Sequence, residues 1–498
     1  MRQNCMGRWK TGLFLLLLTV ASVLIHGYHP YAEDAEIYLP GVERILNPAL
    51  FPTGQEFFLS HASMTLFPRL VAWSIRVTHL SLETALFAWH LVSIFLFLLA
   101  CWQLTCILFS TARARWSSVC LIAALLTIPV AATALYVMDE YLNPRNLAAF
   151  GAVFAVARVL DGKYVRTGLW IVFTACIHPL MWVFPLSFCA LWMMLRQFER
   201  CPGTEKKTGL GPAPVGCLVV MSIPFAVNAG SAYHEAAKMH TYFFLQDWKW
   251  YEWLGILAPL TLLMWFSKIA QKQQMTLLEQ GCRTFSIYGA IYVFVSLVID
   301  LPAPFETLAR LQPMRSLHLL YVFLFVSLGG LVGEYVLKDR PWRWLALFVP
   351  LSLGMFSVQR SLFRDSEAIE WPNREPRNPW AQAFLWVRRN TPANAVFALN
   401  PGYMQALGDD AIGFRCLAQR SRLADLVKDG GVVSMFPPLA DTWWEQIQAQ
   451  SPWDKFQIAD FARLHEKYGV SWVVLQQPDA TELNCPYQNT TVRVCRLR

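Results

Sequence analysis

The sequence predicts a polytopic α-helical membrane protein of about 11 membrane segments that ends in a soluble α/β domain. Of its 498 residues, 55% are hydrophobic and 15% are charged, against roughly 25% charged residues in ordinary soluble domains. Mean hydropathy is +0.35. Long apolar runs recur along residues 1–358, and charged residues become frequent only in 359–498. The surplus of apolar side chains indicates a chain that faces lipid as well as water.

The first apolar run covers 11–28 and follows a short basic stretch. No cleavage site for a signal peptide is evident before His26, so we expect an uncleaved helix whose N-terminus is cytoplasmic. The later apolar runs lie near 83–109, 116–137, 147–160, 167–195, 213–229, 253–267, 285–300, 316–336 and 344–358.

The run 167–195 has basic loops at both ends. Two short helices with a turn at His178-Pro179 would keep the alternation of the loops, because a helical conformation is disfavoured for the residue before a proline. One long, kinked helix is the alternative.

Lys and Arg divide the loops into two sets. One set carries about twice as many Lys and Arg residues as the other. The positive-inside rule makes this richer set cytoplasmic. The poorer set covers 29–82, 138–146, 229–251 and 301–315. We therefore expect these loops, and residues 359–498 after an odd number of spans, on the outer face of a bacterial inner (plasma) membrane.

Residues 359–498 mix helical and strand patterns. The sequence predicts helices at 380–390 and at 452–461, the latter capped by Ser451, and buried strands at 395–399 and 472–475. Cys485 and Cys495 flank a predicted hairpin, where an oxidising compartment would allow a disulfide. Two unpaired buried cysteines are the alternative.

Three acids, Glu33, Asp34 and Glu36, follow the first span directly. Next to them, 40–46 has the pattern of an amphipathic helix on the membrane surface. A carboxylate beside a medium of low dielectric constant has a raised pKa, which suits a general base. A solvated acidic loop is the alternative.

The loop 138–146 is short and contains Asp139, Glu140 and Arg145. An arginine can hold a phosphate through two parallel hydrogen bonds. Arg145 would either do so or pair with one of the two neighbouring acids.

In the last outer loop, Arg315 stands at the mouth of an apolar helix and His318 lies about one turn inside it. Ionisable groups at that depth are candidates for function. The alternative is an arginine that reaches back to the lipid headgroups.

Several function classes find no support. The chain has no Walker loop, H-E-x-x-H pair, nucleophile elbow or Rossmann fingerprint. It has no run of Lys and Arg typical of nucleic-acid binding and no C-x-x-C pair, so we expect neither a nucleic-acid partner nor a cysteine-bound metal.

The order of these features resembles the GT-C superfamily of membrane glycosyltransferases, which take sugars from polyprenyl-phosphate carriers. The shared features are the acidic first loop with the surface helix after it, the second acidic loop, the His-Pro pair between short spans and the C-terminal outer domain. The tail is also similar to that of bacterial membrane proteins of unassigned activity. The residues of that similarity are Phe414, Arg415, Arg420, Ser421, Asp425, Lys428, Asp429 and Gly430.

The resemblance implies roles for single residues. Asp34 would act as general base, with Glu33 or Glu36 as substitutes, and Asp139 or Glu140 would be the second acid. Arg315 would contact the donor phosphate, and Arg145, His178 and His318 would complete the binding site. The first loop lacks a plain Asp-Asp, so a divalent metal stays open as a cofactor.

We therefore expect transfer of a sugar from a polyprenyl-phosphate carrier to an acceptor on the extracytoplasmic face. A transporter or flippase of a lipid-linked or anionic solute, and a non-catalytic assembly protein, are the alternatives. The polar stretch 415–429 would either line the cleft of the site or form an internal network of ion pairs.

Overall fold

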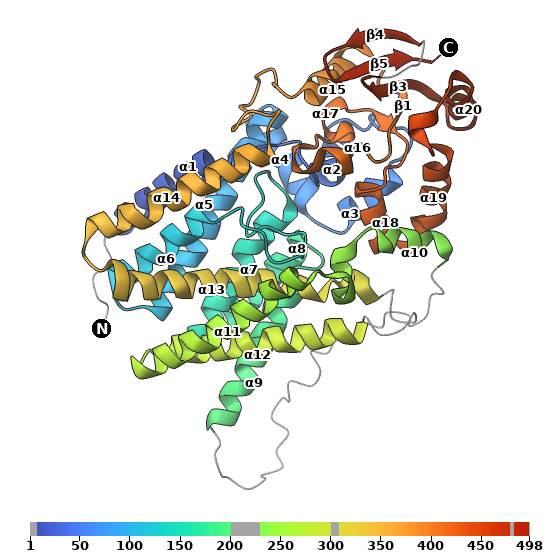
Figure 1. Cartoon of the computed structure of the whole chain (residues 1–498). Coiled ribbons are helices and arrows are strands. Elements are labelled where there is room, and N and C mark those ends of the chain that lie inside the picture. Colours follow the sequence, from blue (N-terminus) through green and yellow to red (C-terminus); the bar gives the residue numbers. More distant parts are fainter. Residues whose placement is uncertain (1–6, 201–229, 300–307, 479–482, 498) are drawn as a thin grey trace.

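The computed structural model describes residues 7–200, 230–299, 308–478 and 483–497, which form a helical body with a small mixed domain at one end (Figure 1). The predicted apolar segment 213–229 lies outside the described residues. Six described helices are long and apolar enough to cross a bilayer, which is compatible with a multi-pass membrane protein. They are α1 (Arg8–His26), α5 (Leu82–Leu108), α11 (Trp250–Lys272), α12 (Thr276–Ile299), α14 (Pro341–Leu362) and the run Leu308–Leu337, which contains α13 (Leu317–Val332).

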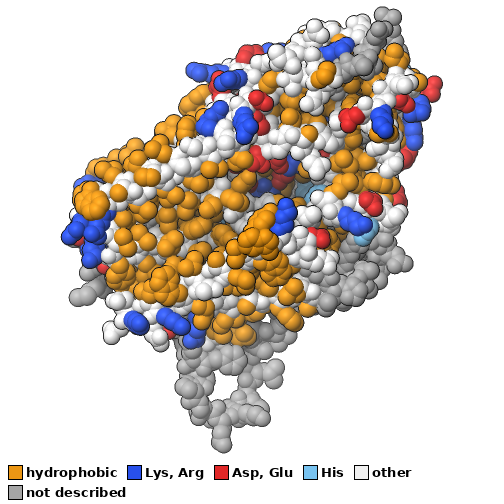
Figure 2. Space-filling model, viewed as in Figure 1, with side chains coloured by type: hydrophobic (Ala, Val, Ile, Leu, Met, Phe, Trp, Pro, Cys, Tyr) orange, Lys and Arg blue, Asp and Glu red, His pale blue; other side chains and the backbone are white. Residues whose placement is uncertain are grey.

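The outer surface of this body suits lipid. Leu345 and Leu353 of α14 are 64% and 60% exposed, and Figure 2 shows hydrophobic side chains covering a broad band of the helical body. Such a band would be unstable in water. The count of about 11 segments stays a prediction, because the remaining helices of the body are shorter. These are α6 (Ala112–Ala124), α7 (Pro144–Leu160), α8 (Tyr164–Ile177) and α9 (Val183–Arg200).

The break predicted at His178-Pro179 is confirmed. Helix α8 ends at Ile177, His178 is extended, and α9 begins at Val183. The Nδ1 atom of His178 accepts hydrogen bonds from the backbone N–H groups of Leu180 and Met181, so the ring closes the turn.

The apolar run 116–137 is not one helix, and this prediction was wrong. Helix α6 ends at Ala124, and the chain then doubles back in a loop in which Val130 N–H donates to Leu135 O. Pro129 explains the difference, because it lacks an N–H group and disfavours a helical residue before it.

Three helices lie between α1 and α5: α2 (Ala35–Leu46), α3 (Glu56–Ser63) and α4 (Phe67–Thr78). The helix predicted at 40–46 begins earlier than expected, and residues 35–43 are buried. Helix α2 packs against α4 on one side and against the C-terminal domain on another. It is therefore an internal helix and not one that lies free on a surface.

The C-terminal domain is a small α/β unit, as predicted. Strand β1 (Val396–Leu399) pairs in parallel with β2 (Ser421–Arg422) and β3 (Val470–Gln476), and the antiparallel hairpin of β4 (Asn484–Gln488) and β5 (Val492–Arg496) extends the sheet to the order β2-β1-β3-β5-β4. Its helices are α15 (Pro379–Asn390), α16 (Tyr403–Leu407), α17 (Phe414–Ala418), α18 (Lys428–Met435), α19 (Ala440–Ala449) and α20 (Ile458–Tyr468).

The helix predicted at 452–461 begins instead at Ile458. Gln457 precedes it, and Gln457 N–H donates to the side chain of Asp460 over 2.7 Å. Ser451 is not the cap, because its hydroxyl donates to Ile447 O at the end of α19.

The domain rests on the loops between the apolar helices. Helix α17 packs on α2, while α18 packs on α3 and on α10 (Ser231–Lys238). Buried residues of the helical body and of the sheet belong to one continuous apolar cluster. This seam between loops and domain encloses the main cavity.

A disulfide joins Cys485 to Cys495 across the β4–β5 hairpin. We expect alkylation without reductant, followed by peptide mass spectrometry, to recover the two cysteines in one linked species. Cys416, which is buried and unpaired, is the control for alkylation after unfolding. Free thiols at both Cys485 and Cys495 in the native protein would contradict the bond.

Candidate functional site

A cavity of about 680 Å³, the charged cavity, lies at the seam between the loops of the helical body and the C-terminal domain. Figure 2 shows acidic, basic and histidine side chains in a hollow beside the hydrophobic band. Segments far apart in the sequence line it, and their charged and aromatic members include Glu33, Asp34, Tyr38, His61, Tyr136, Asp139, Glu140, Arg145, His178, His240, Tyr242, Arg315, Asp409 and Lys428.

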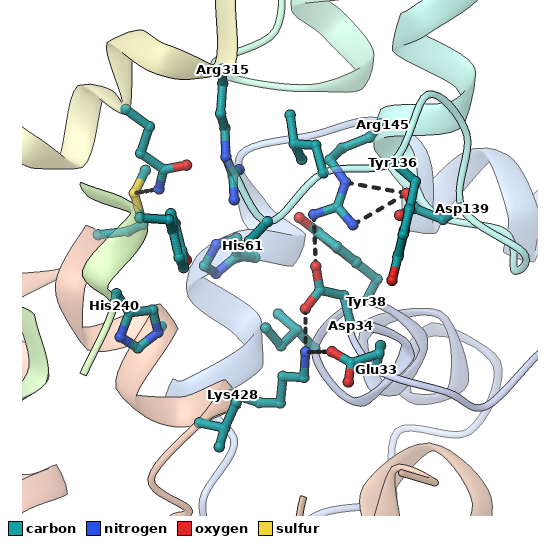
Figure 3. A pocket seen from close by; sticks show the side chains of 18 of the residues that line it. Glu33, Asp34, Tyr38, His61, Tyr136, Asp139, Arg145, His240, Arg315 and Lys428 are labelled. Atoms are coloured by element: carbon teal, nitrogen blue, oxygen red, sulfur yellow. Dashed lines mark hydrogen bonds and ion pairs between the residues drawn. The ribbon is translucent and has the colours of Figure 1, made fainter. Parts of the chain in front are cut away.

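Asp34 stands between two cations (Figure 3). Its Oδ2 atom accepts from Arg145 Nη1 over 2.7 Å, and its Oδ1 atom accepts from Lys428 Nζ over 2.8 Å. Burial alone would raise the pKa of Asp34, but the charges of Lys428 and Arg145 outweigh it and hold that pKa well below its usual range. Asp34 is therefore a carboxylate at neutral pH.

Arg145 is oriented by its own loop. Asn143 caps α7 by accepting from Asn146 N–H over 3.0 Å, and Pro144 occupies the first helical position, as is common in helices. Asp139 Oδ2 then accepts from Arg145 Nη2 over 3.2 Å. Of the two alternatives for Arg145, pairing with a neighbouring acid is confirmed for Asp139, and contact with a phosphate stays a prediction.

Lys428 reaches the cavity from the C-terminal domain. It begins α18, and its backbone N–H donates to Asp425 over 2.6 Å. Its Nζ atom pairs with Glu33 as well as with Asp34. The sequence placed Lys428 in a polar stretch but offered no sign that it meets the first loop.

Arg315 is a cation of the cavity that faces no acid. It lies in the turn Pro313–Ser316 before α13, with its guanidinium carbon 5.6 Å from the ring centre of Tyr242. Its Nε atom is buried without a hydrogen bond, and within the described part of the chain it has no ion-pair partner. A buried guanidinium of this kind is suited to an anion.

Glu140 is an acid of the cavity without a cation. Its Oε2 atom is buried and has no hydrogen-bond partner among the described residues. Burial, and next the charge of Asp139, raise the pKa of Glu140 well above its usual range. This shift favours the protonated form of Glu140.

Histidines line another wall. Burial lowers the pKa of His61 and of His240 to about 4, so both rings are neutral at pH 7. Neither was singled out in the sequence, where a lone histidine has no periodic or spacing signal. His178 also lines the cavity. His318 does not line it; its Nε2 donates to Val137 O, in the loop between α6 and α7, over 2.8 Å.

Glu36 lies outside the cavity, so its place as a substitute base is not supported by the geometry. It is fully buried and accepts from the backbone N–H of Arg415 over 2.7 Å. Arg415 and Arg422 lie 3.4 Å and 3.3 Å from its Oε1 atom.

The rest of the polar stretch divides between the two expected roles. Arg415 donates to Asp429 over 2.8 Å, and Arg422 pairs with Asp425. These side chains form an internal network, whereas Lys428 lines the cavity. Arg420 donates to backbone carbonyls, Thr391 O and Arg388 O among them.

No cluster of three His, Cys, Asp or Glu side chains that could hold a metal ion occurs within residues 7–200, 230–299, 308–478 and 483–497. A divalent metal cofactor therefore stays open, as in the sequence analysis.

No protein-family model and no curated protein matches this chain. Its function must therefore be argued from the cavity itself.

Removing the charge of Glu36 should weaken the seam. We expect Glu36→Gln to lower the free energy of unfolding by about 3 kcal/mol, because breaking a buried ion pair leaves its partners uncompensated. Denaturant unfolding in lipid nanodiscs measures this loss. Glu445→Gln, which removes an exposed partner of Lys467, is the matched control. Equal effects of the two changes would show that the network does not stabilise the seam.

Glu140→Gln should stabilise the protein increasingly as the pH rises. The wild-type carboxyl stays protonated in the folded state while it ionises in the unfolded state, so wild-type stability falls above the unfolded pKa of roughly 4.3. Glutamine does not titrate. The difference in Tm between the variant and the wild type should therefore grow from pH 5 to pH 8, and a constant difference would refute a raised pKa.

Proposed function

We propose that this chain is a membrane glycosyltransferase that transfers a sugar from a polyprenyl-phosphate carrier to an acceptor within the charged cavity. The observation that carries the proposal is that one cavity contains both Arg315, a buried cation without an ion-pair partner among the described residues, and Asp34, a carboxylate held between two cations. A cavity that has both can bind an anion and accept a proton. The resemblance to the GT-C superfamily agrees with this arrangement.

The donor phosphate would lie near Arg315 and Arg145. Guanidinium groups bind phosphate oxygens through paired, charge-assisted hydrogen bonds. The hydrophobic band beside the hollow offers the polyprenyl chain an apolar surface (Figure 2). A lipid-linked anion suits this boundary better than a soluble nucleotide does, since the chain has no motif for nucleotide phosphates.

The carboxylate of Asp34 would act as general base on the acceptor. When the phosphate binds, it competes with Asp34 for Arg145 and Lys428, and the pKa of Asp34 rises toward its usual range. Asp34 then accepts the proton of the acceptor hydroxyl, whose oxygen forms a bond to the anomeric carbon of the sugar. The bond from that carbon to the phosphate oxygen breaks, and the polyprenyl phosphate leaves as an anion paired with the arginines.

Glu33 and Glu140 also line the cavity, and of the two Glu33 is the alternative to Asp34 as general base. Glu33 forms an ion pair with Lys428, while the raised pKa of Glu140 favours its protonated form, which is suited to donate a proton. The loops poor in Lys and Arg gather with the C-terminal domain around the cavity, so the positive-inside rule supports an extracytoplasmic reaction.

The test is transfer from a radiolabelled polyprenyl-phosphate sugar in membranes that contain the protein. We expect Asp34→Asn to lower turnover by at least about a hundredfold, because the amide cannot accept the proton. Glu445→Gln, on the exposed face of the C-terminal domain, should be as active as the wild type.

Equal turnover in Asp34→Asn would move the base to Glu33. Absence of turnover with every donor, together with movement of a lipid-linked sugar across sealed vesicles, would replace the transferase with a flippase.

A further inference from the structure

A second cavity, of about 290 Å³, shares no lining residue with the charged cavity. It lies where the ends of α1, α5 and α14 meet the segment that leads into the C-terminal domain. That segment runs beside the first loop, and Glu370 N–H donates to Tyr28 O over 3.0 Å. The cavity has no role in the transfer reaction proposed above.

Two polar groups in its wall lack partners. Tyr28 is 1% exposed, and its hydroxyl makes no hydrogen bond with any described residue. The Oε1 atom of Glu370 is also buried without a hydrogen bond, and His29 Nδ1 lies 3.8 Å from it. Buried polar atoms in proteins are nearly always satisfied, so these two indicate a bound polar molecule.

The Tyr28 hydroxyl keeps its proton. Burial, and next the charges of Glu370 and Glu83, raise the pKa of Tyr28 well above its usual range. The wall therefore offers a hydroxyl donor at Tyr28 and an acceptor at Glu370. This pair is suited to a ligand hydroxyl or amine, which can accept from one and donate to the other.

An aromatic surface completes the cavity. Trp371 lines it and is 44% exposed. Phe87 supports the indole ring with its centre 5.6 Å away, and Phe87 in turn lies 5.0 Å from the ring of Tyr28. An exposed indole held in this way can stack on an apolar ligand face at little cost in side-chain entropy.

The wall contains four acids, Glu83, Glu367, Glu370 and Glu375, and two arginines, Arg374 and Arg389, so its net negative charge disfavours an anion. Glu83 and Glu375 have arginine partners at 3.5 Å and 2.7 Å. Glu367 and Glu370 line the cavity with no lysine or arginine partner among the described residues. This cavity therefore favours a neutral or cationic ligand, whereas the charged cavity, in which Arg315 has no ion-pair partner among the described residues, favours an anion.

We propose that the second cavity binds a sugar unit that is neutral or carries an amino group. A pyranose ring offers Trp371 the apolar C–H face that stacks on an indole. Its hydroxyls, or an ammonium group, satisfy Tyr28 and Glu370. This site is separate from the transfer reaction and does not depend on it.

The test is saturation-transfer NMR on the full chain in phosphatidylcholine nanodiscs, which contain no glycoside detergent. The probes are glucose, galactose and glucosamine, with glucuronate as the anionic comparison and choline as a cation without a sugar ring. We expect saturable binding of at least one of the first three probes and none of glucuronate. Trp371→Ala should weaken that binding by about tenfold, the loss expected for an aromatic contact.

Three further variants make the result decisive. Glu370→Gln keeps the side-chain shape and should weaken glucosamine more than glucose. Trp342→Ala removes an exposed tryptophan from the far end of α14 and should leave binding unchanged. Asp34→Asn should also leave it unchanged, which separates this site from the transferase.

Several outcomes would overturn the proposal. These are the absence of saturable binding with all three sugars, binding of choline alone, glucuronate binding as tightly as glucose, and full binding by folded Trp371→Ala.

Discussion

The structure depends on a buried carboxylate, that of Glu36. A charge without access to water is tolerated only when partners replace the lost hydration. Helix α2 supplies the charge, and the C-terminal domain supplies Arg415 and Arg422. Among the described residues the cations paired with Glu36 come from the C-terminal domain alone, so burial of this carboxylate requires the domain to sit on the first loop. The position of Lys428 in the cavity follows from this contact, since α18 begins three residues after Asp425 of the same network.

The two cavities differ in the sign of the charge that lacks a partner. In the larger one Arg315 is left over after Asp34 has been shared between Arg145 and Lys428. In the smaller one Glu367 and Glu370 have no arginine partner among the described residues, whereas Glu83 and Glu375 each have one. In a region of low dielectric constant such unpaired groups select ligands strongly. The first loop lies between the two sites, which places opposite preferences a few residues apart.

Local rules predicted much of the fold. The long apolar helices, the break at His178 and the Cys485–Cys495 hairpin follow from hydropathy, proline chemistry and alternation. The errors arose where tertiary contacts outweigh local pattern. The run 116–137 is apolar enough to be a span, yet Pro129 turns it back. Ser451 has the chemistry of a cap, but its hydroxyl donates to a carbonyl of the preceding helix.

The sequence by itself determined that apolar helices alternate with charged loops and end in an α/β domain, because periodicity and composition act over short distances. It also marked Asp34, Asp139, Arg145 and Arg315 as candidates. Tertiary structure decided that these four line one cavity with Lys428, His61 and His240, while Glu36 and His318 face elsewhere. The physical reason is that pairing of buried charges depends on which segments meet in space, and a one-dimensional pattern does not contain that information.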